Sequence, residues 1–132
     1  MRGVPTDIMP KEGCPFCDRV TAGEATAMND LAAAIPDAHP VSPGHTLVVP
    51  RRHVEDFFTL SDDEQAALLD LVRDTRNSLL AHKPDGFNVG VNIGTAAGQT
   101  VPHAHVHVIP RYEGDIEAAR VGLRQVFPRR TR

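Results

Sequence analysis

The chain has 132 residues, of which 41% are hydrophobic and 23% are charged, and this composition is typical of a soluble globular protein. The length suits a single domain over residues 1–132, and no apolar run approaches the ~20 residues of a membrane span. Because the N-terminus also has no signal-peptide pattern, we expect a cytoplasmic protein with no membrane partner.

The net charge of −3 is distributed unevenly along the chain. The last 13 residues carry five arginines and no acidic residue, so the rest has 9 basic and 17 acidic residues, a net charge of −8. An arginine-rich tail can contact nucleic acid or a substrate phosphate, but it is more often a solvated end. We expect a flexible tail from about residue 116 and, because the body is acidic, no nucleic-acid partner.

Both cysteines of the chain lie in one motif, Cys14-Pro15-Phe16-Cys17. In a cytosolic protein this spacing is typical of a redox pair or of half a zinc site. A redox pair would lie between a strand and the helix that follows it, and residues 1–13 show no strand-like alternation. The motif therefore favours zinc, provided that two more ligands exist, over free buried thiols.

The next segments predict strands and a stiff loop. Two short apolar stretches, residues 25–29 and 31–35, flank the turn signal Asn29-Asp30 and predict a hairpin. A loop with three prolines follows over residues 36–44, and residues 45–50 form a β-branched, buried strand.

Ser61 and Glu64 form a capping box at the start of an amphipathic helix that ends near Lys83, before Pro84. Alternation predicts a strand over 87–93, a glycine-bearing loop over 94–100, and another strand after it. The order of elements predicts an α+β fold, with a mostly antiparallel sheet of about five strands packed against one long helix.

The last predicted strand places histidines at three alternate positions, His103, His105 and His107. On a strand they share one face, where they can supply a nucleophile, a proton donor and a metal ligand or orienting group. An isolated HxHxH also occurs on solvated strand faces and in fortuitous metal-binding tracts. Here the preceding glycine-bearing loop offers backbone N–H groups and neutral donors, so loop and row together predict a site that handles phosphate.

Residues 97–111, AGQTVPHAHVHVIPR, closely resemble the signature of the histidine triad (HIT) superfamily. Residues 43–53, PGHTLVVPRRH, resemble the other recurrent block of that family, and the match extends from about residue 14 to 115. The AGQTV and IPRY segments are more similar to the Fhit-type branch than to the purine nucleoside phosphoramidase branch. The resemblance implies a HIT-like fold, a homodimer and a purine nucleotide substrate. The implied reaction is hydrolysis at the α-phosphate of dinucleoside polyphosphates or nucleoside phosphoramidates, through a nucleotidyl-histidine intermediate.

The resemblance also implies roles for three histidines. His105, the middle histidine of the triad, corresponds to the nucleophile, and a neutral imidazole can attack phosphorus at pH 7. His107 corresponds to the group that stabilises or protonates the leaving group. His45 corresponds to the upstream active-site histidine, for which a purely structural role is the alternative.

Five further residues match substrate contacts of the family. Asp37 corresponds to an acceptor for the ribose hydroxyls. Asn92 corresponds to an amide near the scissile phosphate, and Gly98, Gln99 and Thr100 correspond to phosphate contacts. The Fhit branch commonly has glutamine at the position of Asn92, so the natural leaving group stays open.

Members of the family with an N-terminal CxxC resemble relatives of galactose-1-phosphate uridylyltransferase, which bind structural zinc. The resemblance therefore implies a zinc site formed by Cys14, Cys17, His53 and His103. Two alternatives to a hydrolase are a nucleotidyltransferase or phosphorylase and a catalytically weak nucleotide-sensing module. The intact row of histidines favours an enzyme, because a pure binding module does not need the nucleophile.

Overall fold

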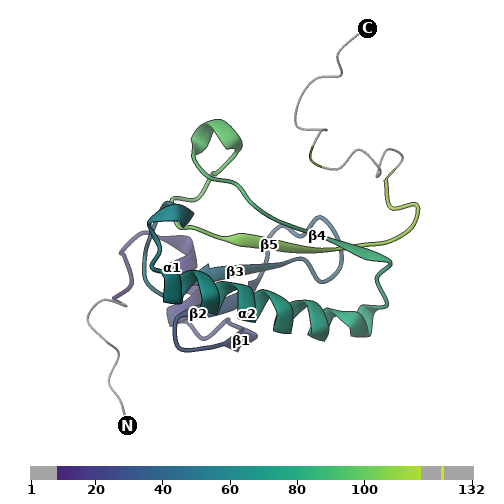
Figure 1. Ribbon diagram of the computed structural model, residues 1–132, viewed down its shortest axis with the longest axis horizontal. Coiled ribbons are helices and arrows are strands. Elements are labelled where there is room, and N and C mark those ends of the chain that lie inside the picture. The colour runs from purple at the N-terminus through teal and green to yellow at the C-terminus, as the bar shows by residue number, and fades with distance from the viewer. Residues whose placement is uncertain (1–8, 117–122, 124–132) are drawn as a thin grey trace, which may run out of the picture.

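The computed structural model describes residues 9–116 and residue 123, so the predicted arginine-rich tail lies outside the described residues. Five strands form one antiparallel sheet in the order β1-β2-β3-β5-β4 (Figure 1). The strands are β1 (Ala27–Met28), β2 (Ala32–Pro36), β3 (Thr46–Pro50), β4 (Gly86–Val91) and β5 (Val106–Arg111), and the α-helices are α1 (Pro15–Thr21) and α2 (Asp62–Leu79). The predicted α+β fold is confirmed, and so is the hairpin formed by β1 and β2.

Helix α2 runs along one face of the sheet and starts at the predicted capping box (Figure 1). The Ser61 hydroxyl accepts from the backbone N–H of Glu64 at 3.1 Å, and the Glu64 carboxylate accepts from the N–H of Ser61 at 3.0 Å. The helix ends at Leu79 and continues as a short 3-10 turn. It stops at Lys83, whose left-handed φ of 55° cannot continue a helix.

The Glu64 carboxylate also connects the start of α2 to the segment that carries His53. It accepts hydrogen bonds from Arg52 Nε at 3.0 Å and from Nη2 at 2.7 Å. The hydrogen bonds from Arg52 lower the pKa of this buried carboxyl, so that it stays ionised at neutral pH. Arg52, which directly precedes His53, is thereby held against the N-terminus of α2.

Alternating side chains of the strands build a separate core on each face of the sheet. The α2 face contains Ala32, Ala34, Val48, Val106 and Val108, and these pack with Leu68, Leu71 and Leu79 of the helix and its end. The opposite face contains Ala33, Ile35, Leu47 and Val49, and these pack with Cys14, Phe16 and Cys17 of the α1 segment. The central strands are therefore covered on both sides, and α1 is the cover on the face that carries the histidines.

Two local features differ from the prediction. The sequence did not reveal α1, because its seven residues, which begin with a proline and include one cysteine, show no helical periodicity. The predicted histidine strand begins at Val106, so His103 and His105 lie in the irregular segment before β5. The reason lies in the backbone: Pro102 has no N–H, and the N–H of Ala104 donates to Val54 O at 2.7 Å instead of to a strand.

None of the helices in the described part of the chain combines the length and the hydrophobicity that a membrane span requires.

Candidate functional site

The four side chains that the resemblance pairs with zinc lie in one cluster. His103 Nδ1 is 3.3 Å from Cys14 Sγ, 3.6 Å from Cys17 Sγ and 3.2 Å from His53 Nδ1. All four candidate ligand atoms lie within 4.8 Å of one another. The edges of a tetrahedron with typical Zn–N and Zn–S bonds are about 3.3–3.8 Å long, so the spacing suits a tetrahedral metal ion.

The protonation of His103 also suits a metal ligand. Its Nε2 lies 2.8 Å from Pro50 O, which can only accept, so Nε2 carries the proton and Nδ1 keeps its lone pair toward the cluster. Burial lowers the pKa of His103 to about 4, so the ring is neutral at pH 7. Burial raises the pKa of the Cys17 thiol, and a bound cation would favour the thiolate instead. The residues therefore fit a metal ion.

Helix α1 places both cysteines in this cluster. Cys14 is the N-cap residue, and its sulfur accepts from the backbone N–H of Cys17 at 3.4 Å. Pro15 follows at the first helical position, where its missing N–H costs nothing. Residues 9–13 form no strand, so the redox arrangement of a strand followed by a CxxC helix is absent from this part of the chain.

His105 lies beside the metal cluster with its ring in a defined orientation. Its Nδ1 is 2.8 Å from the backbone oxygen of His103, and so Nδ1 carries the proton and Nε2 keeps the lone pair. The edge of the Phe16 ring packs against it with the centroids 5.0 Å apart. The residue is 5% exposed, so the ring is nearly buried beside the metal cluster.

His107, His45 and Asp37 form a second polar cluster next to His105. The backbone N–H of Val41 donates to His45 Nδ1 at 3.2 Å, so the proton of the neutral His45 ring lies on Nε2. That Nε2 is 2.9 Å from His107 Nδ1 and 3.2 Å from Asp37 Oδ2. His107 Nδ1 therefore accepts, and its own proton lies on Nε2. The pair His105 and His107 thus offers one free lone pair and one N–H donor, side by side, with ring centroids 5.1 Å apart.

Both of these histidines line a cleft of about 430 Å³ on the α1 face of the sheet. Its other lining residues come from three places in the chain. They are Pro15, Phe16 and Arg19 of α1; Asp37, Ala38, His39 and Leu47 around β2 and β3; and Asn92, Gly98, Thr100 and Val101 around the glycine-bearing loop. The structure thus brings Asp37, Asn92, Gly98 and Thr100 to one cleft with the histidines. The sequence alone did not suggest Phe16, Arg19, His39 or Leu47, because their spacing relative to the triad carries no signal.

The glycine-bearing loop is held by Gln99, which does not line the cleft. Gln99 Oε1 accepts from Gly94 N at 2.8 Å, and Nε2 donates to the backbone oxygens of Glu55 and Val101 at 2.8 and 3.2 Å. Gly98 has a φ of +94°, and a Cβ there would lie 3.4 Å from Asn92 Nδ2. The Gln99 side chain therefore fixes the loop in this structure, and its contact with phosphate stays a prediction.

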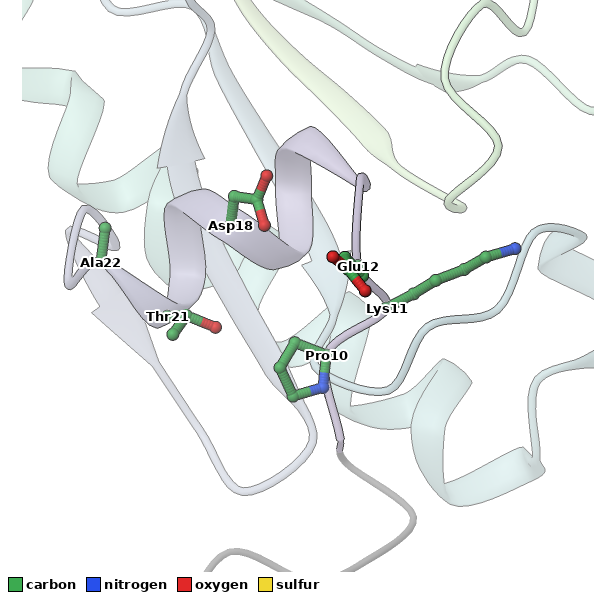
Figure 2. A pocket seen from close by; sticks show the side chains of 6 residues that line it. All are labelled: Pro10, Lys11, Glu12, Asp18, Thr21 and Ala22. Carbon is green, nitrogen blue, oxygen red and sulfur yellow. The ribbon is translucent and has the colours of Figure 1, made fainter.

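The other face of α1 borders a separate pocket of about 350 Å³, lined by Pro10, Lys11, Glu12, Asp18, Thr21 and Ala22 (Figure 2). This pocket contains no histidine, cysteine or glycine-bearing loop among its lining residues. The cysteines and the triad histidines thus lie on the side of α1 that packs against β2 and β3.

Comparison with known proteins identifies the family. The HIT domain matches residues 19–114 of the sequence. The chain belongs to the HIT family. An uncharacterized HIT-like protein of Methanocaldococcus jannaschii is 41% identical over 113 residues, covering 83% of this chain and 87% of that protein. The AP-4-A phosphorylase of Mycobacterium tuberculosis is 41% identical over 98 residues, which is 70% of this chain but 49% of that enzyme.

Solved structures of HIT proteins share the fold. A HIT family protein from Bacillus anthracis superposes with a TM-score of 0.74 at 31% identity, covering 89% of this chain and 87% of that one. A Zn-bound histidine triad family protein from Mycobacterium smegmatis gives a TM-score of 0.72 at 31% identity, covering 78% of each chain. The resemblance found in the sequence is therefore confirmed at the level of the family and of the fold.

The polar cluster makes stability depend on pH. Burial lowers the pKa of His45 and of His107 from 6.5, so the unfolded chain binds these protons more readily than the folded chain does. We predict that the free energy of unfolding, measured with a denaturant, falls as the pH drops from 7.5 to 5.5. His107→Asn removes one of these two titrating side chains. The change in the free energy of unfolding per pH unit should therefore be smaller in this variant than in the parent protein, by at most about 1.4 kcal/mol. A slope that is identical in both proteins would contradict the prediction.

Proposed function

We propose that this HIT protein is a nucleotide hydrolase that cleaves at the α-phosphate of dinucleoside polyphosphates or nucleoside phosphoramidates. The observation that carries the proposal is the set of hydrogen bonds made by the two histidine rings in the cleft, from which we infer their protonation states. His105 has its lone pair on Nε2, and its neighbour His107 has its proton on Nε2. A nucleophile and a proton donor of this kind are what displacement of a leaving group from phosphorus requires.

In the proposed first step, His105 Nε2 attacks the α-phosphorus and forms an N–P bond. The bond from phosphorus to the bridging oxygen or nitrogen breaks, and the leaving atom keeps the bonding electron pair while it accepts a hydrogen bond from His107 Nε2; a phosphate group leaves as its anion, and an amine takes its proton from solvent. In the second step, water attacks the phosphorus, the N–P bond breaks and restores the lone pair of His105 Nε2, and the proton of the water passes to solvent. His45 donates to His107 Nδ1 throughout and keeps the proton of that ring on Nε2.

The proposed substrate lies along the cleft with its phosphate against the glycine-bearing loop. Asn92, Gly98 and Thr100 would contact the phosphate oxygens, and Asp37 would accept from the ribose hydroxyls. A purine base would then lie against Phe16 of α1 and Leu47 of β3, which are among the apolar residues of the lining.

Nucleotidyl transfer to phosphate is a second candidate, supported by the similarity to AP-4-A phosphorylase. The two reactions share the first step and differ in whether water or phosphate attacks the intermediate. Product analysis with and without inorganic phosphate distinguishes a nucleoside monophosphate from a nucleoside diphosphate.

We also propose that Cys14, Cys17, His53 and His103 bind a structural zinc ion. Four protein ligands leave no open position for substrate, as is usual for structural zinc. Support comes from the spacing of the ligand atoms and from the Zn-bound protein of Mycobacterium smegmatis. The ion would hold α1 against the segment that carries His105.

The proposal further includes a homodimer of single-domain chains. Strand β4 forms one edge of the sheet, and the side chain of its residue Val89 is 51% exposed. Unpaired edges with exposed apolar side chains favour association with a second copy.

The first prediction here concerns the nucleophile. His105→Asn should bind nucleoside monophosphate but lose turnover, because no N–P bond can form, whereas His107→Asn should slow turnover by about 10²–10⁴-fold. Mass spectrometry of acid-unstable adducts after rapid quenching should place a nucleotidyl group on His105 of the unmodified protein. His82→Asn, an exposed histidine outside this cleft, serves as the control. Turnover by His105→Asn above about a hundredth of normal, or an adduct on another histidine, would refute the assignment.

The second prediction concerns the metal. Elemental analysis should find about one zinc per chain, and Cys14→Ser should lose the ion and lower the melting temperature, because metal binding contributes to folding free energy. His105→Asn should keep its zinc, although it lies two residues from His103. A zinc-free protein, purified without chelator and with reduced cysteines, would be evidence against the site.

The third prediction concerns assembly. Sedimentation at micromolar concentration should give about twice the chain mass of 14.3 kDa, and Val89→Glu should shift the protein toward the monomer by placing charges at the edge. Phe58→Glu changes an apolar residue outside the sheet that is 72% exposed, more than Val89, and should leave the mass unchanged. A monomeric parent protein contradicts the dimer.

A further inference from the structure

We propose that Arg19 makes this cleft selective for nucleotides with a 6-oxopurine base, guanine or hypoxanthine, over adenine nucleotides. This inference rests on the proposed nucleotide site, and it concerns a residue for which neither the sequence pattern nor the geometry of the triad suggested a role.

Arg19 lies on the wall of the cleft formed by α1. Residues 15, 16 and 19 follow helical spacing and line the cleft, whereas Asp18, Thr21 and Ala22 face the pocket of Figure 2. Phe16 contacts the ring of His105, and Arg19 follows one helical turn later on the same face. The guanidinium is therefore placed beyond Phe16, next to where the base would lie.

One edge of the Arg19 guanidinium is held and the other is unused. Nε donates to Glu24 Oε1 at 2.9 Å, and the side chain is only 19% exposed. Among residues 9–116, neither terminal nitrogen has a hydrogen bond within the protein. A partly buried guanidinium whose two terminal NH₂ groups lack partners among these residues presents a preoriented pair of donors to a ligand.

The donors of Arg19 match one type of purine edge. A guanidinium can only donate, and it pairs with the adjacent O6 and N7 acceptors of guanine through two parallel hydrogen bonds. Adenine presents the N7 acceptor beside the N6 amino group, which is itself a donor, so one of the two bonds becomes a contact between donors. Hypoxanthine keeps both acceptors and should bind as guanine does.

The apolar surroundings strengthen this discrimination. Phe16 and Leu47 belong to one buried apolar cluster, and together with Pro15 they are among the residues that line the cleft. In such surroundings an unpaired donor costs more than it does in water, so the donor left beside N6 of adenine offsets the bond to its N7, whereas a 6-oxopurine gains both bonds.

Calorimetric titration with GMP, IMP and AMP tests the inference without requiring turnover. The parent protein should bind GMP and IMP about tenfold or more tightly than AMP, and 7-deaza-GMP, which lacks N7, should lose part of that advantage. Arg19→Met should abolish the preference while leaving the affinity for AMP within about twofold, and its retained AMP binding shows that the variant is folded. Arg19→Lys keeps the charge but not the paired donors, so it should lose most of the preference.

Arg73→Met, at an exposed arginine of α2, is the matched control and should keep the preference of the parent protein. Equal affinity of the parent protein for GMP and AMP overturns this inference and leaves the proposed nucleotide site standing. An equal loss of GMP and AMP affinity in Arg19→Met also overturns it, because the guanidinium would then serve a phosphate. If no nucleotide binds the parent protein, the proposed function fails together with the inference.

Discussion

Two backbone carbonyls decide what the neighbouring histidines can do. Pro50 O accepts a hydrogen bond from Nε2–H of His103, so the Nδ1 lone pair faces the two cysteines and His53. His103 O accepts a hydrogen bond from Nδ1–H of His105, so the lone pair of that ring lies on Nε2. The same residue type, two positions apart, therefore has opposite protonation, which suits one ring to a metal and the other to phosphorus. The site depends on this pattern because an imidazole with its proton on the wrong nitrogen cannot perform either task.

Helix α1 connects the metal cluster to the cleft. Cys14 and Cys17 hold its first turn in the cluster, while Phe16 packs against both His103 and His105. A metal ion in the cluster would therefore stabilise the wall against which the proposed nucleophile rests. Arg19 extends the same wall, so the seven residues of this helix contribute ligands, packing and the proposed base selectivity.

Much of the fold could be predicted from the sequence because its elements carry local signals. The capping box at Ser61 located the long helix, and the turn at Asn29-Asp30 located the first hairpin. The resemblance to the HIT family also named the four residues that the structure gathers into the metal cluster and several of those that line the cleft. Local patterns did not reveal α1, the irregular backbone before Val106 or the buried role of Gln99 in fixing its loop. Each of these depends on contacts with distant residues, such as Ala104 with Val54 and Gln99 with Glu55.

The protonation pattern of the ring nitrogens can be observed directly. Long-range ¹H–¹⁵N correlation spectra of ¹⁵N-histidine-labelled protein at pH 7 report which nitrogen of each ring carries the proton, and single His→Asn variants assign the signals. Our account predicts a proton on Nδ1 of His105 and on Nε2 of His103 and His107. A proton on Nε2 of His105 would remove the lone pair from the position that the proposed attack requires and would contradict the account.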